Sequence, residues 1–181
     1  MGCNFIASHT NEDTAPIVIC HPFGPNRALY SHKALMPLEG ELYMDGREIR
    51  FEKEKSFMII DDHKGYYPFE MKYDWVTTAG FDVNGRLVGF NLTDNQVKNH
   101  EKYNENCLWT GNRVHLLPPR KVKRPEGSMG TWLINDEYGM VDLKFEPQIE
   151  SKVDINALIL KSRYRAPYGV FSGHIKDGNG D

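Results

Sequence analysis

Two turn dipeptides, each set between runs of alternating apolar and polar residues, constrain the fold of this chain more than any other feature. Asp45-Gly46 divides residues 41–52, and Asn84-Gly85 separates residues 76–83 from residues 86–92. Both dipeptides readily supply the positive φ angles that a tight hairpin turn requires. The sequence therefore predicts two antiparallel hairpins.

The rest of the chain carries a similar strand pattern. Nine Tyr and nine Phe favour sheet, and Glu137-Tyr138-Gly139 marks a third turn. Residues 151–165 are ambiguous between strand and helix, and their alternation favours one long strand, whereas residues 94–104 predict a polar loop or a short surface helix. Further strands are predicted at Ile17–Cys20, Ser56–Asp61, Glu70–Trp75, Cys107–Thr110, Arg113–Leu116, Thr131–Asn135, Met140–Phe145 and Gly169–Lys176.

These patterns predict an all-β, antiparallel fold of about ten or more strands, either a barrel or a strongly curved sandwich, with little helix. A length of 181 residues suits one domain. We expect residues 1–15 to be poorly ordered and residues 16–181 to form a single β domain. Residues 177–180 have the composition of a hairpin turn with no return strand after it, so we expect the chain to be a fragment of a longer protein.

Composition excludes several classes of function. The formal net charge is −3, and the one basic run, residues 120–124, is too short to predict nucleic-acid binding. No segment has the length of a membrane span or the pattern of a secretory signal. The three Cys residues are widely spaced, which favours reduced thiols in the cytoplasm. We predict no metal site and no cofactor, because the common ligand spacings and phosphate-binding loops are missing.

The richest polar cluster follows the predicted strand that ends at residue 61. Asp61 and His63 are candidates for general acid–base catalysis, because a carboxylate can orient an imidazole and raise its basicity. Lys64 and Tyr67 are candidate ligand-binding residues, since a lysine offers a positive charge to an anionic group. The same residues with Gly65 also suit an ordinary turn, and both interpretations stay open.

A second group of candidates comes from the middle of the chain. Glu105 is a candidate acid or base, because an apolar mouth would raise the pKa of its carboxyl group. Asn91 interrupts a strand pattern and points either into a pocket or to partners within the chain. Asn106, Trp75 and Trp109 are further candidate ligand-binding residues, with core packing as the alternative for the two tryptophans.

The N-terminal polar residues are interpreted differently. His21 opens a stiff, turn-rich segment that runs to Asn26, and His32 and Lys33 follow it. We interpret these as loop and strand-edge residues, with His32 as a weaker candidate for reaching a pocket.

Several segments in order resemble an uncharacterised bacterial family, domain of unknown function 2804. The resembling segments are residues 60–68 (IDDHKGYYP), 88–92 (VGFNL), 104–106 (NEN), 136–147 (DEYGMVDLKFEP) and 168–173 (YGVFSG). The chain departs from the family pattern at Asp62-His63, where a small or aromatic pair is usual, and at Thr93, where Gly is common. This family is distantly similar to the lipocalin-like superfamily of carotenoid 1,2-hydratases.

The resemblance implies a calycin-like, lipocalin-like β fold with a ligand pocket, and no particular activity. It also implies that the chain corresponds to the C-terminal part of a longer family member that carries one more strand.

Three hypotheses for function follow. The first is a module that binds a small, partly apolar molecule. The second is an enzyme of the hydratase or isomerase type, using Asp61, His63 or Glu105 for proton transfer on a hydrophobic substrate. The third is a structural half of a larger β protein, or a homodimer formed through an open sheet edge.

Overall fold

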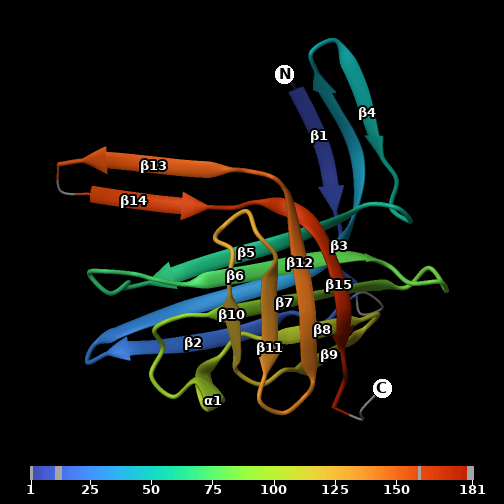
Figure 1. Ribbon diagram of the computed structural model, residues 1–181. Coiled ribbons are helices and arrows are strands. Elements are labelled where there is room, and N and C mark those ends of the chain that lie inside the picture. The colour runs from blue at the N-terminus through green and yellow to red at the C-terminus, as the bar shows by residue number, and fades with distance from the viewer. Residues whose placement is uncertain (1, 11–13, 159, 179–181) are drawn as a thin grey trace. The chain divides into compact units, whose positions relative to one another are not determined.

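The computed structural model describes residues 2–10, 14–158 and 160–178, which divide into two compact units, 1–119 and 120–181. The all-β prediction is confirmed, because strands dominate both units (Figure 1). The first unit contains β1 (Gly2–Ala7), β2 (Ile17–Gly24), β3 (Arg27–Met44), β4 (Arg47–Phe51), β5 (Phe57–Gly65), β6 (Asp74–Phe81), β7 (Leu87–Asp94), α1 (His100–Tyr103), β8 (Cys107–Thr110) and β9 (Arg113–Leu116). The second contains β10 (Arg120–Lys123), β11 (Trp132–Asp136), β12 (Val141–Ile149), β13 (Lys152–Ala157), β14 (Leu160–Arg165) and β15 (Tyr168–Ile175).

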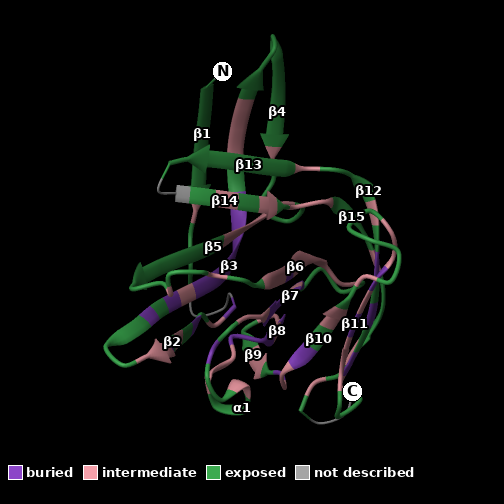
Figure 2. Cartoon of the chain, turned by 60° about the vertical axis from the view of Figure 1, so that its left-hand side comes forward, coloured by how far each residue is buried: buried purple, intermediate pink, exposed green. Residues whose placement is uncertain are grey.

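Strand β3 organises the first sheet. Its N-terminal half pairs with β2 on one side and β5 on the other, and its C-terminal half pairs with β1 and β4. Gly40 lies in the second half with a φ of 139°, and a Cβ there would approach the Asn4 carbonyl oxygen to 2.1 Å. The middle of β3 is the most deeply buried part of this sheet (Figure 2).

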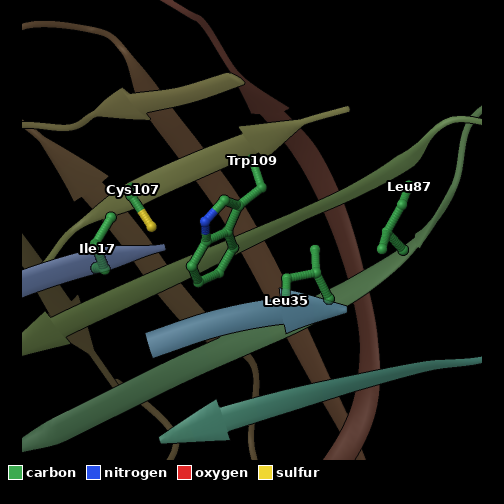
Figure 3. Close-up of a cluster of buried hydrophobic side chains, with 5 residues drawn as sticks. All are labelled: Ile17, Leu35, Leu87, Cys107 and Trp109. Atoms are coloured by element: carbon green, nitrogen blue, oxygen red, sulfur yellow. The ribbon is translucent and has the colours of Figure 1, made fainter. Parts of the chain in front are cut away.

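Strands β6 to β9 form a second sheet, an antiparallel meander, within the same unit. The two sheets meet at a core in which Ile17 and Leu35 from the first face Leu87, Cys107 and Trp109 from the second (Figure 3). A Cβ added at Gly89 of β7 would lie 2.9 Å from the Leu35 side chain. The sheets therefore approach each other closely at this glycine.

The second unit is a four-stranded sheet in the order β10-β11-β12-β15, with the hairpin β13–β14 inserted between β12 and β15. Its buried residues alternate along β12, and Phe145 packs on Trp132 and Phe171. The prediction of one long strand over residues 151–165 is wrong. The chain reverses between Ala157 and Leu160, so the same alternation continues on two paired strands.

The three predicted turns are present. Asp45 and Gly46 have φ angles of 52° and 73°, as a tight hairpin requires. At the second turn Gly85 has a φ of 74°, but the connection is longer, with the Asp82 carboxylate accepting from the Asn84 and Arg86 amides. At the third, Asp136 accepts hydrogen bonds from the backbone amides of residues 138–140.

Other predictions need correction or refinement. Residues 2–7, expected to be poorly ordered, form β1, whereas residues 11–13 and 179–181 lie outside the described part of the chain. The strand predicted at Glu70–Trp75 begins only at Asp74. The segment after residue 94 contains the short helix α1, which Asn99 caps by accepting from the Lys102 amide.

The packing of two sheets in the first unit agrees with the sandwich alternative. Among the described residues the strands fall into separate sheets, and their pairings do not close one continuous barrel. The helix described in this chain is too short to cross a membrane.

Candidate functional site

The inner face of the β2-β3-β5 sheet changes from apolar to polar along its length. Leu35, Lys33, Ser31 and Leu29 alternate along β3, so all four side chains point to the same face, and all four are buried. The register sets Lys33 opposite Asp61 and Ser31 opposite His63 on β5. The pleat thus places a lysine, a serine, a carboxylate and an imidazole side by side inside the first unit.

Lys33 is the centre of this cluster, with a side chain only 1% exposed. Its ammonium nitrogen lies 2.5 Å from Asp61 Oδ1 and 3.7 Å from Glu105 Oε2. The same nitrogen lies 5.4 Å from the centroid of the Trp75 ring. A buried ammonium ion requires such partners, because moving its charge out of water costs on the order of several kcal/mol even after the protein relaxes around it.

Asp61 also contacts His63, which in turn contacts Tyr67. His63 Nε2 lies 2.9 Å from Asp61 Oδ1, and His63 Nδ1 lies 3.0 Å from the Tyr67 hydroxyl. An ionised carboxylate only accepts hydrogen bonds, so a tautomer with its proton on Nε2 turns that proton toward Asp61 and leaves Nδ1 to accept from the Tyr67 O–H. The three side chains form a chain of polar contacts that leads from the buried Lys33 outward.

This chain ends at solvent. The side chains of Asp61 and His63 are 24% and 30% exposed, and Tyr67 is 46% exposed. Arg27 donates to the Tyr67 backbone carbonyl at 2.7 Å, which fixes the position of the residue. Partial burial, with smaller contributions from the charges of Asp61 and Glu105, raises the pKa of the Tyr67 phenol. The phenol therefore stays protonated at neutral pH and is available as a proton donor.

Glu105 lies in the loop between α1 and β8, reaches Lys33 from there and is itself buried. Ser31 Oγ donates to Glu105 Oε2 at 2.7 Å. The Asn91 side chain on β7 accepts from Trp75 Nε1 at 2.7 Å and donates to the Glu105 backbone carbonyl at 2.8 Å. Asn91 thus fixes both the ring beneath the ammonium and the backbone that carries the carboxylate.

His21, on β2, completes the buried side of the cluster. It is 1% exposed, and its Nε2 lies 3.9 Å from Glu105 Oε2, beyond hydrogen-bonding distance. Burial lowers the pKa of His21, and the charges of His63 and Lys33 lower it further against the opposing effect of Glu105. The ring is therefore neutral at physiological pH.

The structure brings most of the predicted site residues together. The cluster contains all three proposed acid–base residues and three of the proposed ligand-binding residues: Asp61, His63, Glu105, Tyr67, Trp75 and Asn91. The other three lie elsewhere. Lys64 is exposed on β5, Trp109 is fully buried in the core with its Nε1 bonded to the Ala15 carbonyl, and Asn106 bridges the Thr93 amide and the Pro118 carbonyl.

Three members of the cluster were not among the predicted site residues: His21, Ser31 and Lys33. Interpreting His21 and Lys33 as loop and strand-edge residues is wrong, because both are buried within strands. A signal was present in the sequence, since Lys33 lies at even spacing from Leu29 and Leu35 and so shares a strand face with both. A lysine at an apolar-face position of such a strand requires a buried partner.

The arrangement suits proton transfer between a bound molecule and the Tyr67 phenol. In such a transfer His63 would relay the proton, Asp61 would orient the imidazole and stabilise its charged form, and Lys33 would hold Asp61 in place. Among the described residues there is no group of three or more His, Cys, Asp or Glu side chains placed to hold a metal ion. Within this cluster the cation is the Lys33 ammonium itself.

Neither the curated proteins nor the solved structures include a match to the chain. A family model described as Domain of unknown function (DUF2804) matches residues 5–181, which is nearly the entire sequence. The resembling segments of the sequence, including the one that carries Asp61, His63 and Tyr67, fall within this match. The chain therefore belongs to the DUF2804 family.

Proposed function

We propose that the chain binds a small, partly apolar molecule beside Tyr67 and transfers protons to or from it, in a reaction of the hydratase or isomerase type. The observation that carries the proposal is that Asp61 Oδ1 contacts both His63 Nε2 and Lys33 Nζ, while the same His63 ring contacts a half-exposed tyrosine. A proton relay that is held by a buried ion pair at one end and is open to solvent at the other is arranged like a general acid–base site.

The segment between β5 and β6 supports an apolar component of the ligand. Tyr66, Phe69 and Tyr73 are 70%, 103% and 47% exposed, respectively, and they flank Tyr67 in the sequence. Exposed aromatic side chains grouped in this way are typical of a ligand-binding surface. In this proposal the bound molecule contacts these aromatic residues and presents its polar group to the Tyr67 hydroxyl. A calycin-like relationship of the whole fold is part of the same proposal and rests on the family resemblance.

Solvent deuterium incorporation tests the proposal even while the natural product is unidentified. Small α,β- and β,γ-unsaturated ketones are incubated with the protein in D2O and analysed by mass spectrometry, because hydration, isomerisation and enolisation all introduce deuterium. Tyr67→Phe is expected to lower the rate of deuterium incorporation by about 100-fold, which is the lower end of the range that a general acid or base usually contributes. His63→Gln is expected to act in the same direction.

Tyr66→Phe is the matched control, because Tyr66 is adjacent, more exposed, and outside the chain of polar contacts formed by Asp61, His63 and Tyr67. Its rate is expected to equal that of the wild type. Equal incorporation by the wild type and Tyr67→Phe would contradict a role for the phenol in proton transfer.

A further inference from the structure

The imidazole of His21 lies inside the first unit and forms no hydrogen bond with any residue that the structure describes. The residue is 1% exposed, and neither Nδ1 nor Nε2 has a hydrogen-bond partner among the described residues. Buried polar atoms are almost always paired, so two unpaired nitrogens on one ring point to a partner outside the polypeptide. A neutral imidazole offers one donor and one acceptor.

The position of Glu105 indicates where that partner binds. Glu105 Oε2 lies 3.9 Å from His21 Nε2 and already accepts a hydrogen bond from Ser31. An oxygen atom about 2.8 Å from each of the two atoms would subtend an angle of about 90° between them, roughly 20° narrower than the tetrahedral angle between an O–H bond and a lone pair and within the range that hydrogen bonds tolerate. One oxygen can therefore bridge the imidazole and the carboxylate.

The charges around this position select the chemistry of the partner. A carboxylate or phosphate would be repelled by Glu105, and an amine cation would be repelled by Lys33, whose nitrogen lies 3.7 Å from the same Glu105 oxygen. A neutral hydroxyl fits both neighbours, because it donates to the carboxylate and accepts from the imidazole N–H.

We infer that His21 and Glu105 form an interior hydroxyl-binding site, which takes either a water molecule or the hydroxyl group of an alcohol. The site goes beyond the proton relay proposed above, since it lies on the Glu105 side of Lys33 and requires no role for Tyr67. Water and alcohol offer the same donor and acceptor, so the experiment distinguishes the two sources.

A crystal structure of the full chain provides the direct test. We expect an oxygen within 2.6–3.2 Å of both His21 Nε2 and Glu105 Oε2, a range typical of hydrogen bonds. A second crystal soaked in ethanol distinguishes the sources: displacement by ethanol identifies an alcohol site, and an unchanged oxygen identifies a water site. A His21 ring bonded on both nitrogens to protein groups, or a map with no oxygen at this position, would overturn the inference.

The substitution His21→Phe gives an independent test, because the sign of the change in melting temperature depends on whether the ring nitrogens have a partner. Phenylalanine keeps the ring and removes both nitrogens. If the nitrogens have no partner, the variant melts at a higher temperature than the wild type. If Nε2 binds the oxygen, the variant loses that hydrogen bond and melts at a lower temperature, which is the result we expect.

His32→Phe on the adjacent strand is the matched control, because His32 points to the opposite face of the sheet from Lys33. Tyr67→Phe is expected to leave the His21 oxygen in place. Loss of proton transfer in that variant would therefore be separable from loss of the hydroxyl site.

Discussion

The ammonium nitrogen of Lys33 lies 2.5 Å from Asp61 Oδ1, across a pair of neighbouring strands, and is almost completely buried. Each partner depends on the other, because a buried charge without its counterion is strongly unfavourable. Through Asp61 the lysine also supports His63 and Tyr67. This pair is therefore both a stability element and the anchor of the proposed site.

Replacing Lys33 by Met is expected to lower the free energy of unfolding by about 3 kcal/mol, at the lower end for a broken buried ion pair because Asp61 is partly open to solvent. Urea denaturation at pH 7 measures the change. Lys64→Met, one residue beyond His63 on β5 and exposed, is the control and should change the free energy by less than about 0.5 kcal/mol. A Lys33→Met variant as stable as the wild type would show that the ion pair contributes nothing.

The lowered pKa of His21 makes stability depend on pH. The unfolded chain binds a proton at His21 at a higher pH than the folded chain does, so the contribution of this residue is full above about pH 6.5 and decreases as the pH falls toward the folded pKa. Thermal unfolding of the wild type and His21→Phe at pH 7.5, 6.5 and 5.5 isolates the effect. The stability difference should shift in favour of the variant as the pH falls, and a difference independent of pH would contradict the assignment.

The amide of Asn91 connects the two halves of the cluster. Asn91→Ala is expected to cost about 2–3 kcal/mol, because it leaves the Trp75 indole N–H and the Glu105 carbonyl without their partner. Chemical denaturation gives the magnitude, and indole fluorescence reports on Trp75. Asn156→Ala, at an exposed position of β13, is the control and should be nearly neutral. A neutral Asn91→Ala would mean that both groups find other partners.

Gly89 has no room for a side chain, because the neighbouring strand β6 and Leu35 of the facing sheet both lie against it. A Cβ there would lie 2.8 Å from both Ala79 Cβ and the Thr78 carbonyl oxygen, and the backbone oxygen cannot move easily. Gly89→Ala is expected to destabilise the protein by about 1–3 kcal/mol through overpacking. Gly80→Ala on the neighbouring strand meets nothing within 4 Å and provides the matched control. Similar melting temperatures for the two variants would contradict this explanation.

The three cysteines should differ in reactivity. Cys3 and Cys20 are exposed, whereas burial raises the pKa of Cys107 to about 12. Since the thiolate is the reactive form, labelling the native protein with iodoacetamide at pH 8 should modify Cys3 and Cys20 and spare Cys107. Peptide mass spectrometry identifies the sites, and labelling in 6 M guanidinium should reach all three. Rapid modification of Cys107 in the native state would show that the core opens readily.

The local sequence pattern predicted correctly those strands and turns whose residues favour a single local conformation. Cys107–Thr110 and Arg113–Leu116 have the predicted bounds, and the Asp45-Gly46 hairpin forms because only a few residue types accept two successive positive φ angles. The prediction failed where the same alternating pattern is compatible with two different structures. Residues 151–165 alternate throughout, but alternation alone does not distinguish one strand from two paired strands.

The sequence by itself determined the all-β class, the main turns and the candidacy of Asp61, His63 and Glu105. The tertiary structure alone decided that these three meet, and that Lys33 and His21 belong with them. The physical reason is register: Lys33 faces Asp61 only because β3 pairs with β5 at that offset, and it meets Glu105 only because a second sheet packs against the first. A charged residue at a buried position of a strand requires a partner, and the long-range pairing of strands and packing of sheets determine which residue that partner is.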